Sequence, residues 1–401
     1  EVFTDVDIHV IETGDNPNPQ LTQPKRSRIF DEYYKDLIVN FTYSDRPDDY
    51  QASAILYIAG GNWLNNSYVQ DLIEWRHKQG YIVYTYSTPT SNENTIKSYI
   101  QNAYDTWENP PEIVGLIGDT DVIDCFYHNW SGYNGATDFD YTQLNGSDLI
   151  SDVFIGRISA QSSSMMGAVI NKTIQYEKAS YVGDEWFKRS VLVGDPYPSG
   201  ISNVFTSQYI ENIMINHGMT DVVTDYDGSG ISNSVNQQFE NGVLYYNYRG
   251  WYYGDGSYPT GSCCNNGYQT PFVTTITCGT GDFDSGNSSS ESWVEMGSIN
   301  NPQGAVAAVG VSTAGTHTAY NNIVDMGIYD GIFPKDLWYA GAVTSNGHLS
   351  ILATYPSNPS GATETFISWT NLMGDPALHL WTDVPTDFSF AHPSSISLGT
   401  T

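Results

Sequence analysis

The stretch from Tyr245 to Phe283 reads YYNYRGWYYGDGSYPTGSCCNNGYQTPFVTTITCGTGDF. Its apolar runs, Val243–Tyr248 and Phe272–Thr277, predict two buried strands, each followed by a glycine-rich loop. The second strand delivers Cys278 at its tip. A thiol in this position is exposed, lies next to backbone amides and is supported by a rigid sheet. An α/β protein carries its nucleophile at such a place.

Short apolar strands alternate with amphipathic helices on both sides of this stretch, which is typical of a largely parallel sheet covered by helices. The strands expected before it are Ile55–Ile58, Tyr81–Tyr86, Val114–Gly118, Asp152–Ile158, Ser190–Val193 and Asp221–Thr224, and the one after it is Gly304–Val311. The expected helices are Val69–Lys78, Asn94–Trp107, Ser163–Lys178, Val204–His217, Ile231–Glu240, Glu291–Gly297 and Asn322–Ile332.

This pattern predicts two tandem α/β subdomains, residues 51–182 and 183–383, the second of which carries Cys278. Residues 1–50 are polar and rich in Pro and Asp, with one strand-like run, Leu37–Phe41, and we expect this lead-in to pack on the first subdomain. Residues 384–401 alternate like the first strand of an Ig-like β-sandwich, so a longer parent chain is expected.

The composition limits the classes of partner. The chain of 401 residues has 15 Lys and Arg against 45 Asp and Glu, a net charge of −30. Such a field repels nucleic acid and anionic membranes and favours calcium and basic polypeptides, although it also serves solubility or a salty environment. No apolar run reaches about 18 residues, so we expect no membrane insertion. Many Tyr and Trp with few Lys fit a secreted bacterial protein.

The four cysteines, at positions 125, 263, 264 and 278, are too few for a disulfide framework in a chain of this length. Cys263 and Cys264 are adjacent and lack the C-x-x-C spacing, so we do not expect zinc. Whether one of them pairs with Cys125 stays open at this point.

Five short motifs occur in order between Ile55 and Leu380. They are Leu116-Ile117-Gly118-Asp119, Ser151-Asp152-Val153-Phe154-Ile155-Gly156-Arg157, Asn247-Tyr248-x-Gly250, Cys278-x-x-Gly281-Asp282-Phe283 and Gly374-Asp375-Pro376-Ala377-Leu378. Together they resemble the gingipain-type cysteine peptidases of the caspase-like group. The resemblance implies caspase-like α/β subdomains, hydrolysis of peptide bonds in polypeptide substrates, structural Ca²⁺ and no organic cofactor.

The resemblance also implies roles for individual residues. In that family a histidine after Asn-Tyr-x-Gly and a cysteine after the next strand form the catalytic dyad, so the nucleophile here is Cys278. The acidic residue that orients the histidine corresponds to Asp152, and the glycine of the oxyanion hole to Gly250. The histidine position is occupied by Trp251. Tryptophan offers one N–H donor and no base.

Another histidine could supply the base. His317 follows the strand Gly304–Val311, which we expect to lie beside the Cys278 strand at a spacing of about 4.8 Å. In the gingipains this loop helps to form the pocket for the substrate side chain, and His317 could equally line that pocket. His128 is a poorer candidate. His77, His217 and His348 are expected at the surface, and His9 and His392 lie outside the α/β units.

Charged residues near the motifs leave further alternatives open. Arg249 could stabilise a thiolate or an oxyanion, or pair with a carboxylate as a structural partner. Asp152 could instead pair with Arg157 or Arg249. Arg-directed gingipains have a pocket carboxylate soon after Ile-Gly-Arg, and the segment Ile158–Met165 has none. Asp225-x-Asp227-Gly228-Ser229-Gly230 and Asp282-Phe283-Asp284 have features of calcium loops, although turns and helix caps explain them equally well.

Two functions follow as hypotheses. The first is a secreted or cell-surface bacterial cysteine endopeptidase with Cys278 as nucleophile, His317 as base and Asp152 as support. The second is a catalytically inactive gingipain-like module that serves as a surface, adhesion or assembly subunit, which the exposed aromatic run Trp251-Tyr252-Tyr253 favours. The sequence leaves the oligomeric state and the cleavage specificity undetermined.

Overall fold

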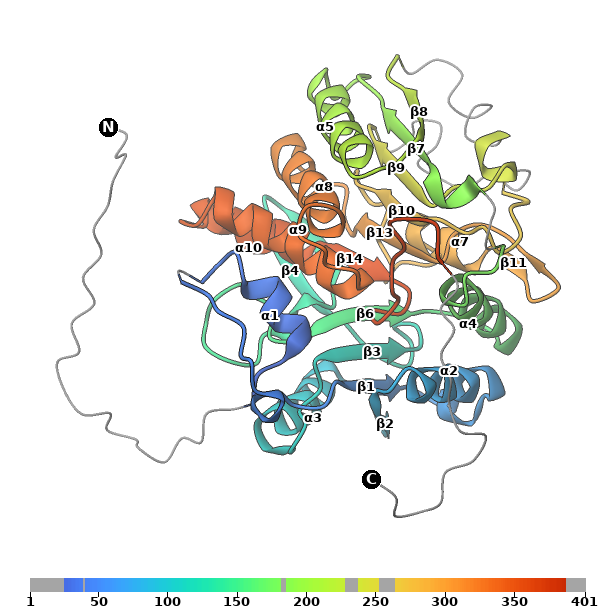
Figure 1. The fold of residues 1–401 in the computed structure, drawn as a ribbon. Coiled ribbons are helices and arrows are strands. Elements are labelled where there is room, and N and C mark those ends of the chain that lie inside the picture. The colour runs from blue at the N-terminus through green and yellow to red at the C-terminus, as the bar shows by residue number, and fades with distance from the viewer. Residues whose placement is uncertain (1–24, 39, 182–184, 228–236, 252–263, 387–401) are drawn as a thin grey trace.

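The computed structural model describes residues 25–38, 40–181, 185–227, 237–251 and 264–386. At its centre lies a ten-stranded sheet in the order β2-β1-β3-β6-β14-β13-β10-β9-β7-β8 (Figure 1). The strands are β1 (Ala54–Ala59), β2 (Ile82–Ser87), β3 (Ile113–Ile117), β6 (Phe154–Ile158), β7 (Arg189–Gly194), β8 (Asp221–Asp225), β9 (Tyr245–Arg249), β10 (Phe272–Thr275), β13 (Ala307–Val311) and β14 (Thr370–Met373).

The sheet consists of two parallel blocks that run in opposite directions. Strands β2, β1, β3 and β6 are parallel to one another, and so are β13, β10, β9, β7 and β8. Strand β14 joins the blocks, because it is parallel to β6 through Met373 and Arg157 but antiparallel to β13 through Leu372 and Val309. The C-terminal ends of β9 and β10 and the N-terminal end of β6 therefore lie along the same side of the sheet, the side on which these strand ends open into loops.

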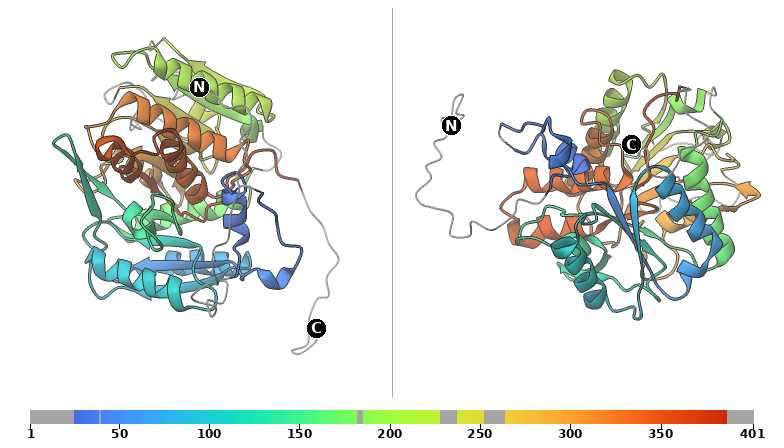
Figure 2. Two further views of the ribbon diagram at one scale, coloured as in Figure 1. Left: turned by 90° about the vertical axis from the view of Figure 1, so that its left-hand side faces the viewer. Right: turned by 60° about the horizontal axis from the view of Figure 1, so that its bottom comes forward.

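Helices cover both faces of this sheet (Figure 1 and Figure 2). They are α1 (Arg28–Tyr34), α2 (Ser67–Lys78), α3 (Glu93–Thr106), α4 (Ser163–Glu177), α5 (Ser202–Asn216), α7 (Ser289–Glu295), α8 (Thr318–Ile332), α9 (Ala340–Thr354) and α10 (Ala362–Ser368). Short 3-10 helices lie at Pro47–Asp49, Trp63–Asn65, Phe139–Thr142, Glu185–Lys188 and Pro359–Gly361. Two further ladders are the hairpins β4 (Phe126–Trp130) with β5 (Tyr133–Thr137) and β11 (Gly297–Ser298) with β12 (Asn301–Pro302).

Alternate strand residues divide the core between the two faces, as the period of a strand requires. Ile55 and Tyr57 belong to the largest apolar cluster, which includes side chains from α1, α2, α4, α5, α8 and α9. Leu56 and Ile58 face the other way and pack with α3. Tyr246 lies in a third cluster with α7, whose N-terminus is fixed by a capping box.

The expected α/β class is confirmed, and most expected elements lie within a few residues of their observed bounds. The lead-in is an exception, because the described residues of the run, 37, 38, 40 and 41, are not in a strand and α1 precedes them. As expected, the lead-in packs on the first half of the sheet, with the rings of Phe30 and Phe154 stacked at 4.3 Å. The β4–β5 hairpin, α9 and α10 were not predicted. Most of the expected β-sandwich start, and residues 231–236 of an expected helix, lie outside the described residues.

A buried ion network explains the motif at residues 374–378. The Arg76 guanidinium donates to Asp375 at 2.8 Å and to Glu177 at 2.7 Å, and the Tyr57 hydroxyl also donates to Asp375 at 2.8 Å. Arg76 and both carboxylates are almost completely buried. The motif thereby joins the chain after β14 to helices α2 and α4, so its role is structural.

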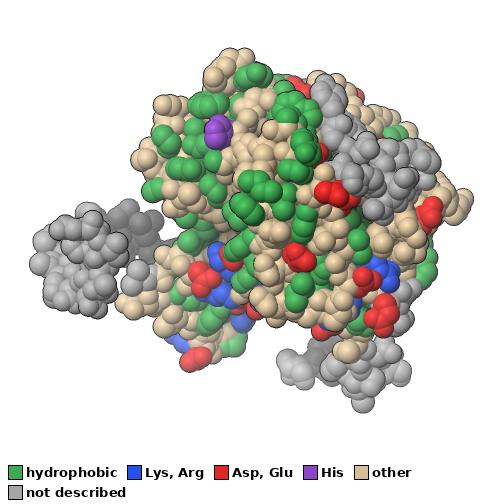
Figure 3. All heavy atoms as spheres, turned by 90° about the horizontal axis from the view of Figure 1, so that it is seen from above, with side chains coloured by type: hydrophobic (Ala, Val, Ile, Leu, Met, Phe, Trp, Pro, Cys, Tyr) green, Lys and Arg blue, Asp and Glu red, His purple; other side chains and the backbone are tan. Residues whose placement is uncertain are grey.

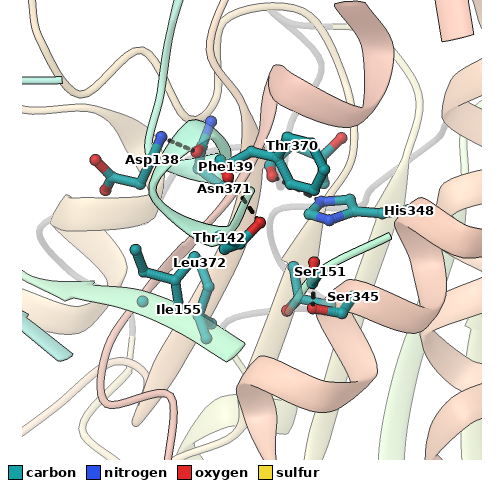
Figure 4. Close-up of a pocket in the computed structure, with 12 residues that line it drawn as sticks. Asp138, Phe139, Thr142, Ser151, Ile155, Ser345, His348, Thr370, Asn371 and Leu372 are labelled. Atoms are coloured by element: carbon teal, nitrogen blue, oxygen red, sulfur yellow. Dashed lines mark hydrogen bonds between the residues drawn. The ribbon is translucent and has the colours of Figure 1, made fainter. Parts of the chain in front are cut away.

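His348 is buried in the middle of α9, and the expectation of a surface position is wrong. Its Nε2 donates to the carbonyl oxygen of Thr370 at 3.0 Å, and the side chain lines a small internal cavity together with Ser151, Ser345 and Asn371 (Figure 4). Burial lowers the pKa of His348 to about 4.

A membrane span needs a long, uniformly apolar helix, and the described residues contain none.

The buried histidine predicts a loss of stability in acid. Between pH 6.5 and about 4 the unfolded chain binds a proton that the folded His348 does not, so stability falls as the pH falls through this window. The expected contribution is about 3 kcal/mol at most. Urea unfolding of wild-type protein and His348→Gln at pH 7 and pH 4.5 checks this. Parallel pH dependences of the two proteins would show that another group controls acid unfolding.

Candidate active site

Cys278 lies in the turn that follows β10, half-buried and with a free thiol. Two hydrogen bonds hold the turn against the segment after β13, from the amide of Gly279 to Thr313 at 2.9 Å and from the amide of Gly281 to Val311 at 3.0 Å. Gly279 has a φ of +67°, which favours glycine. A Cβ on Gly281 would lie 2.6 Å from the backbone of Gly310, so a side chain has no room there. Both glycines of the motif thus serve to place the thiol.

The partner of the Cys278 thiol is a hydroxyl group. Its Sγ lies 3.1 Å from Oγ1 of Thr316, and that oxygen also accepts a hydrogen bond from Nδ2 of Asn321 at 3.2 Å. Asn321 occupies one lone pair of the oxygen, so the Thr316 hydroxyl can either donate its proton to the sulfur or accept the S–H at its second lone pair. A hydroxyl can hydrogen-bond a thiol in this way, but it cannot take up the thiol proton at neutral pH.

His317 is the N-cap of α8, and its Nδ1 accepts the amide N–H of Ala319 at 3.2 Å. The ring is exposed, and no hydrogen bond joins it to Cys278 within the described part of the chain. A neutral imidazole that accepts at Nδ1 carries its proton on Nε2, so this arrangement leaves His317 a donor at its other nitrogen. To act as a base toward Cys278, His317 would have to leave the cap.

Asp152 lies just before β6 and accepts hydrogen bonds at 2.8 Å from the amides of Leu144 and Asn145. Burial raises the pKa of its carboxyl, although the two amides oppose this shift. Strands β14 and β13 separate β6 from β10, which places the two strands roughly 14 Å apart at about 4.8 Å per strand. The described residues give Asp152 no hydrogen bond to Trp251 or His317.

The alternative pairing of Asp152 with Arg157 is wrong. Arg157 donates through Nε at 2.8 Å and Nη2 at 2.7 Å to the carboxylate of Asp138, which is buried with it. Its Nη1 also donates to the carbonyl oxygens of Gly118 and Ile123. The arginine of the second motif therefore anchors the loop after β3 to the segment after β5.

Gly250 and Trp251 lie at the end of β9, beside the Cys278 turn. The carbonyl oxygen of Gly250 accepts a hydrogen bond from Oγ1 of Thr277 at 2.7 Å, which ties the two loops together. A Cβ at position 250 would come within 2.8 Å of the Tyr248 ring and of Asp195, so only glycine fits. The Trp251 side chain is 41% exposed. Tyr252 and Tyr253 lie outside the described residues.

Arg249 is buried behind these loops and connects the end of β9 to the loop after β10 and to the first turns of α8. Its Nε donates to Asn322 at 2.7 Å, Nη1 to the carbonyl oxygen of Ile276 at 3.0 Å, and Nη2 to that of Thr318 at 3.3 Å. Burial lowers the pKa of Arg249 to about 10, against the opposing charges of Asp325 and Cys278, so it is a cation at neutral pH. Among the described residues no carboxylate lies within ion-pair distance, and the expected carboxylate partner is wrong.

Helix α8 supplies buried polar groups that sequence reasoning missed. Asp325 is completely buried, accepts a hydrogen bond from Nδ2 of Asn247 at 2.7 Å, and has its pKa raised to about 7 by burial. Asn322, one turn earlier, holds Arg249. The polar residues at positions 321, 322 and 325, spaced along one side of a largely apolar helix, were the signal that could have identified this face.

Within the described residues, no hydrogen bond joins another histidine or cysteine to the Cys278 thiol. His128 lies in β4 and pairs with Asp140 at 3.0 Å, a contact that raises its pKa. His77 and His217 are exposed, as expected. Cys264 is disulfide-bonded, whereas Cys125 is free and buried, so a disulfide at Cys125 is excluded.

The proposed calcium loops remain a prediction. The carboxyls of Asp282 and Asp284 are neighbours, and burial with this like-charged partner raises the pKa of Asp282 to about 6. Ser285 donates to Asp282 at 2.9 Å. Across the residues that the structure describes, no group of three or more His, Cys, Asp and Glu side chains is arranged to hold a metal ion. Residues 228–230 of the other loop lie outside the described residues.

Known proteins resemble this chain in sequence. The family model of peptidase family C25 matches residues 48–381. Gingipain R2 of Porphyromonas gingivalis is 24% identical over 424 aligned residues, which cover 99% of this chain and 56% of the relative. Lys-gingipain of the same organism is 26% identical over 212 residues, or 49% of this chain and 12% of the relative. The chain thus spans about half or less of the length of these curated relatives.

Solved structures share its fold. The crystal structure of the Arg-specific cysteine proteinase gingipain R superposes with a TM-score of 0.74 at 22% identity and covers 86% of this chain and 82% of that chain. A complex of the pro- and mature domains of RgpB from P. gingivalis gives the same TM-score at 21% identity, with 86% and 84% of the two chains covered. These likenesses confirm the caspase-like α/β architecture expected from the sequence.

Proposed function

Because this chain belongs to peptidase family C25, we propose that it binds extended polypeptides around Cys278 and does not hydrolyse them at the rate of a histidine-paired cysteine peptidase. The observation that carries this proposal is the surroundings of the thiol. Trp251 occupies the position of the family histidine, and the partner of Sγ is the hydroxyl of Thr316.

Peptide hydrolysis by a thiol needs a group that takes up the thiol proton and later protonates the leaving amine. General acid–base groups of this kind contribute about 10²–10⁴-fold to the rate. Neither the Thr316 hydroxyl nor the indole of Trp251 does this. His317 is engaged as a helix cap, and Asp152 is engaged with two amides. The polypeptide is then bound but its cleavage is slow.

The binding part of the proposal rests on the groups that remain in place. The amide of Cys278 has no hydrogen-bond acceptor among the described residues, so it can donate to a bound carbonyl oxygen. Gly250 keeps the close approach of the two loops. We propose that such a module works at the bacterial surface or outside the cell, as an adhesion or assembly subunit.

A second candidate function is a slow cysteine endopeptidase, and the position of Arg249 favours it. The guanidinium lies behind a free, half-exposed thiol and is a cation at neutral pH. A neighbouring cation favours a thiolate and stabilises an oxyanion. In this reading His317 leaves the helix cap and supplies the proton transfers, with Asp152 as a distant support.

Two measurements, one on His317→Ala and one on Cys278→Ala, decide between the candidates. Under the favoured proposal, a peptide carrying a thiol-reactive electrophile labels wild-type protein and His317→Ala at the same rate, because His317 does not act on the thiol. Digestion of an unfolded protein substrate is equally slow for wild type and Cys278→Ala. A labelling rate that falls more than tenfold in His317→Ala, together with hydrolysis that requires Cys278, would establish the peptidase instead.

A further inference from the structure

Helix α5 exposes a row of large apolar side chains on the side turned away from the sheet. Ile201, Phe205 and Tyr209 are 57%, 60% and 44% exposed. They are four residues apart, so they lie one above another along one side of the helix. Ile215 is also exposed and continues this side toward the C-terminus of α5.

The opposite side of α5 packs on β7 and α8 through Val204, Ile210, Ile213 and Met214, beside the buried polar side chains of Asn203, Thr206 and Ser207. A surface helix normally carries charged and polar side chains on its outer side, so a row of large apolar side chains there is unusual. The exposed positions between the apolar ones are Gln208, Asn212 and Asn216, which carry no charge. The one charged residue of α5, Glu211, accepts a hydrogen bond from the Tyr226 hydroxyl.

The row continues toward the candidate active site. Tyr197 is 72% exposed, and its amide donates to the carboxylate of Asp195 at 2.8 Å. The amide of Asp195 donates in turn to the carbonyl oxygen of Arg249 at 3.0 Å, two residues before Trp251. We call Tyr197, Ile201, Phe205 and Tyr209 the α5 strip. Figure 3 looks onto the end of the molecule that carries α5 and shows apolar side chains gathered there.

We propose that the α5 strip binds an apolar segment of an extended polypeptide and so lengthens the polypeptide site at Cys278, an inference that rests on the proposed function. The spacing of the strip fits such a partner. Residues four apart on a helix are separated by about 6 Å along its axis. Alternate side chains of an extended chain, which point to the same side, are about 6.6 Å apart. Ile201, Phe205 and Tyr209 can therefore meet alternate side chains of the partner, and Tyr197 lies in the turn before the helix.

The net charge of the chain limits which polypeptides can approach the α5 strip. Two copies of this protein, each with a net charge of −30, repel one another as they approach. A neutral or basic polypeptide does not meet this barrier, and a basic one is attracted. The structure therefore favours a partner segment with alternating aromatic or aliphatic residues and flanking lysines over a second copy of the chain.

Peptide binding to strip variants tests this proposal. The probe is a fluorescein-labelled ten-residue peptide in which Phe and Val alternate with Ser between terminal lysines, followed by fluorescence anisotropy at 0.15 M salt. We expect Phe205→Gln/Tyr209→Gln to weaken binding at least tenfold. Tyr43→Gln is the matched control, because Tyr43 is an equally exposed aromatic residue of the lead-in, and its expected change is less than twofold.

The outcomes separate this inference from the proposed function. The proposal that the α5 strip binds a polypeptide would be overturned if wild type and the double variant bound the peptide equally well, or if wild type did not bind it. A wild-type dimer in light scattering that the double variant abolishes would also overturn it. Loss of binding in the double variant supports the strip even where protein digestion requires Cys278, a result that overturns only the proposed lack of hydrolysis.

Discussion

Replacing Trp251 with histidine is expected to give this protein a peptidase activity that depends on Cys278. Position 251 directly follows the loop glycine whose carbonyl oxygen is hydrogen-bonded to Thr277, so an imidazole there is attached next to the thiol turn. It would take the thiol proton and return it to the leaving amine, a contribution of about 10²–10⁴-fold. We expect the lower end of this range, because Asp152 is held by two amides and does not orient the new ring.

The measurement is the rate of cleavage of a quenched fluorescent peptide library by Trp251→His. Trp251→Phe is the matched control, because it changes the same partly exposed side chain without adding a base. The double variant Trp251→His/Cys278→Ala should be as slow as wild type. A Trp251→His protein that folds normally and cleaves no faster than wild type would show that the missing histidine is not what limits the wild-type site.

The largest effect on stability is expected from Arg76→Met. This change leaves the buried carboxylates of Asp375 and Glu177 without their cation, and breaking a buried ion pair in this way costs about 3–5 kcal/mol. The free energy of unfolding from urea titration measures the loss at pH 7. Adding Glu177→Gln and Asp375→Asn to Arg76→Met should recover part of it, because neutral side chains are cheaper to bury than unpaired carboxylates.

A control for this experiment lies on the same helix. Lys78 pairs with Glu74 at 2.6 Å, but both side chains are more than 60% exposed to solvent. Exposed pairs of this kind contribute little, so Lys78→Met should change the free energy of unfolding by less than about 0.5 kcal/mol. Equal losses from the two substitutions would mean that burial does not set the strength of the Arg76 network.

The two sets of variants address separate properties of the molecule. The Arg76 network lies among α2, α4 and the segment after β14, and Tyr57 of β1 completes it. The Trp251 loop follows β9, at the C-terminal ends of the strands of the other parallel block. A change in peptidase activity in Trp251→His therefore reports on the thiol site, and a change in stability in Arg76→Met reports on the packing of the first block.

The sequence determined the class of the fold and the place of the thiol. Apolar runs of strand length, helical spacing between them and glycines after the strands are local properties, so they identify most elements within a few residues. The glycines after Cys278 are an example, because one needs a positive φ and the other has no room for a Cβ. The absence of a histidine at position 251 is also plain in the sequence, since it requires only the order of the motifs.

The tertiary structure alone decided how the two parallel blocks join and what surrounds the thiol. Strand β14 has four residues, too few for a periodic signal, yet its antiparallel pairing with β13 reverses one block against the other. The partners of Cys278 and Arg249 include Thr316 and Asn322, which are distant in sequence and which propensity and spacing do not position. Those of Asp152 lie in a nearby loop whose return to β6 the sequence does not predict either. The sequence of α5 shows that Ile201, Phe205 and Tyr209 recur every four residues. Whether this side of the helix is exposed depends on which side packs on the sheet, and only the tertiary structure decides that.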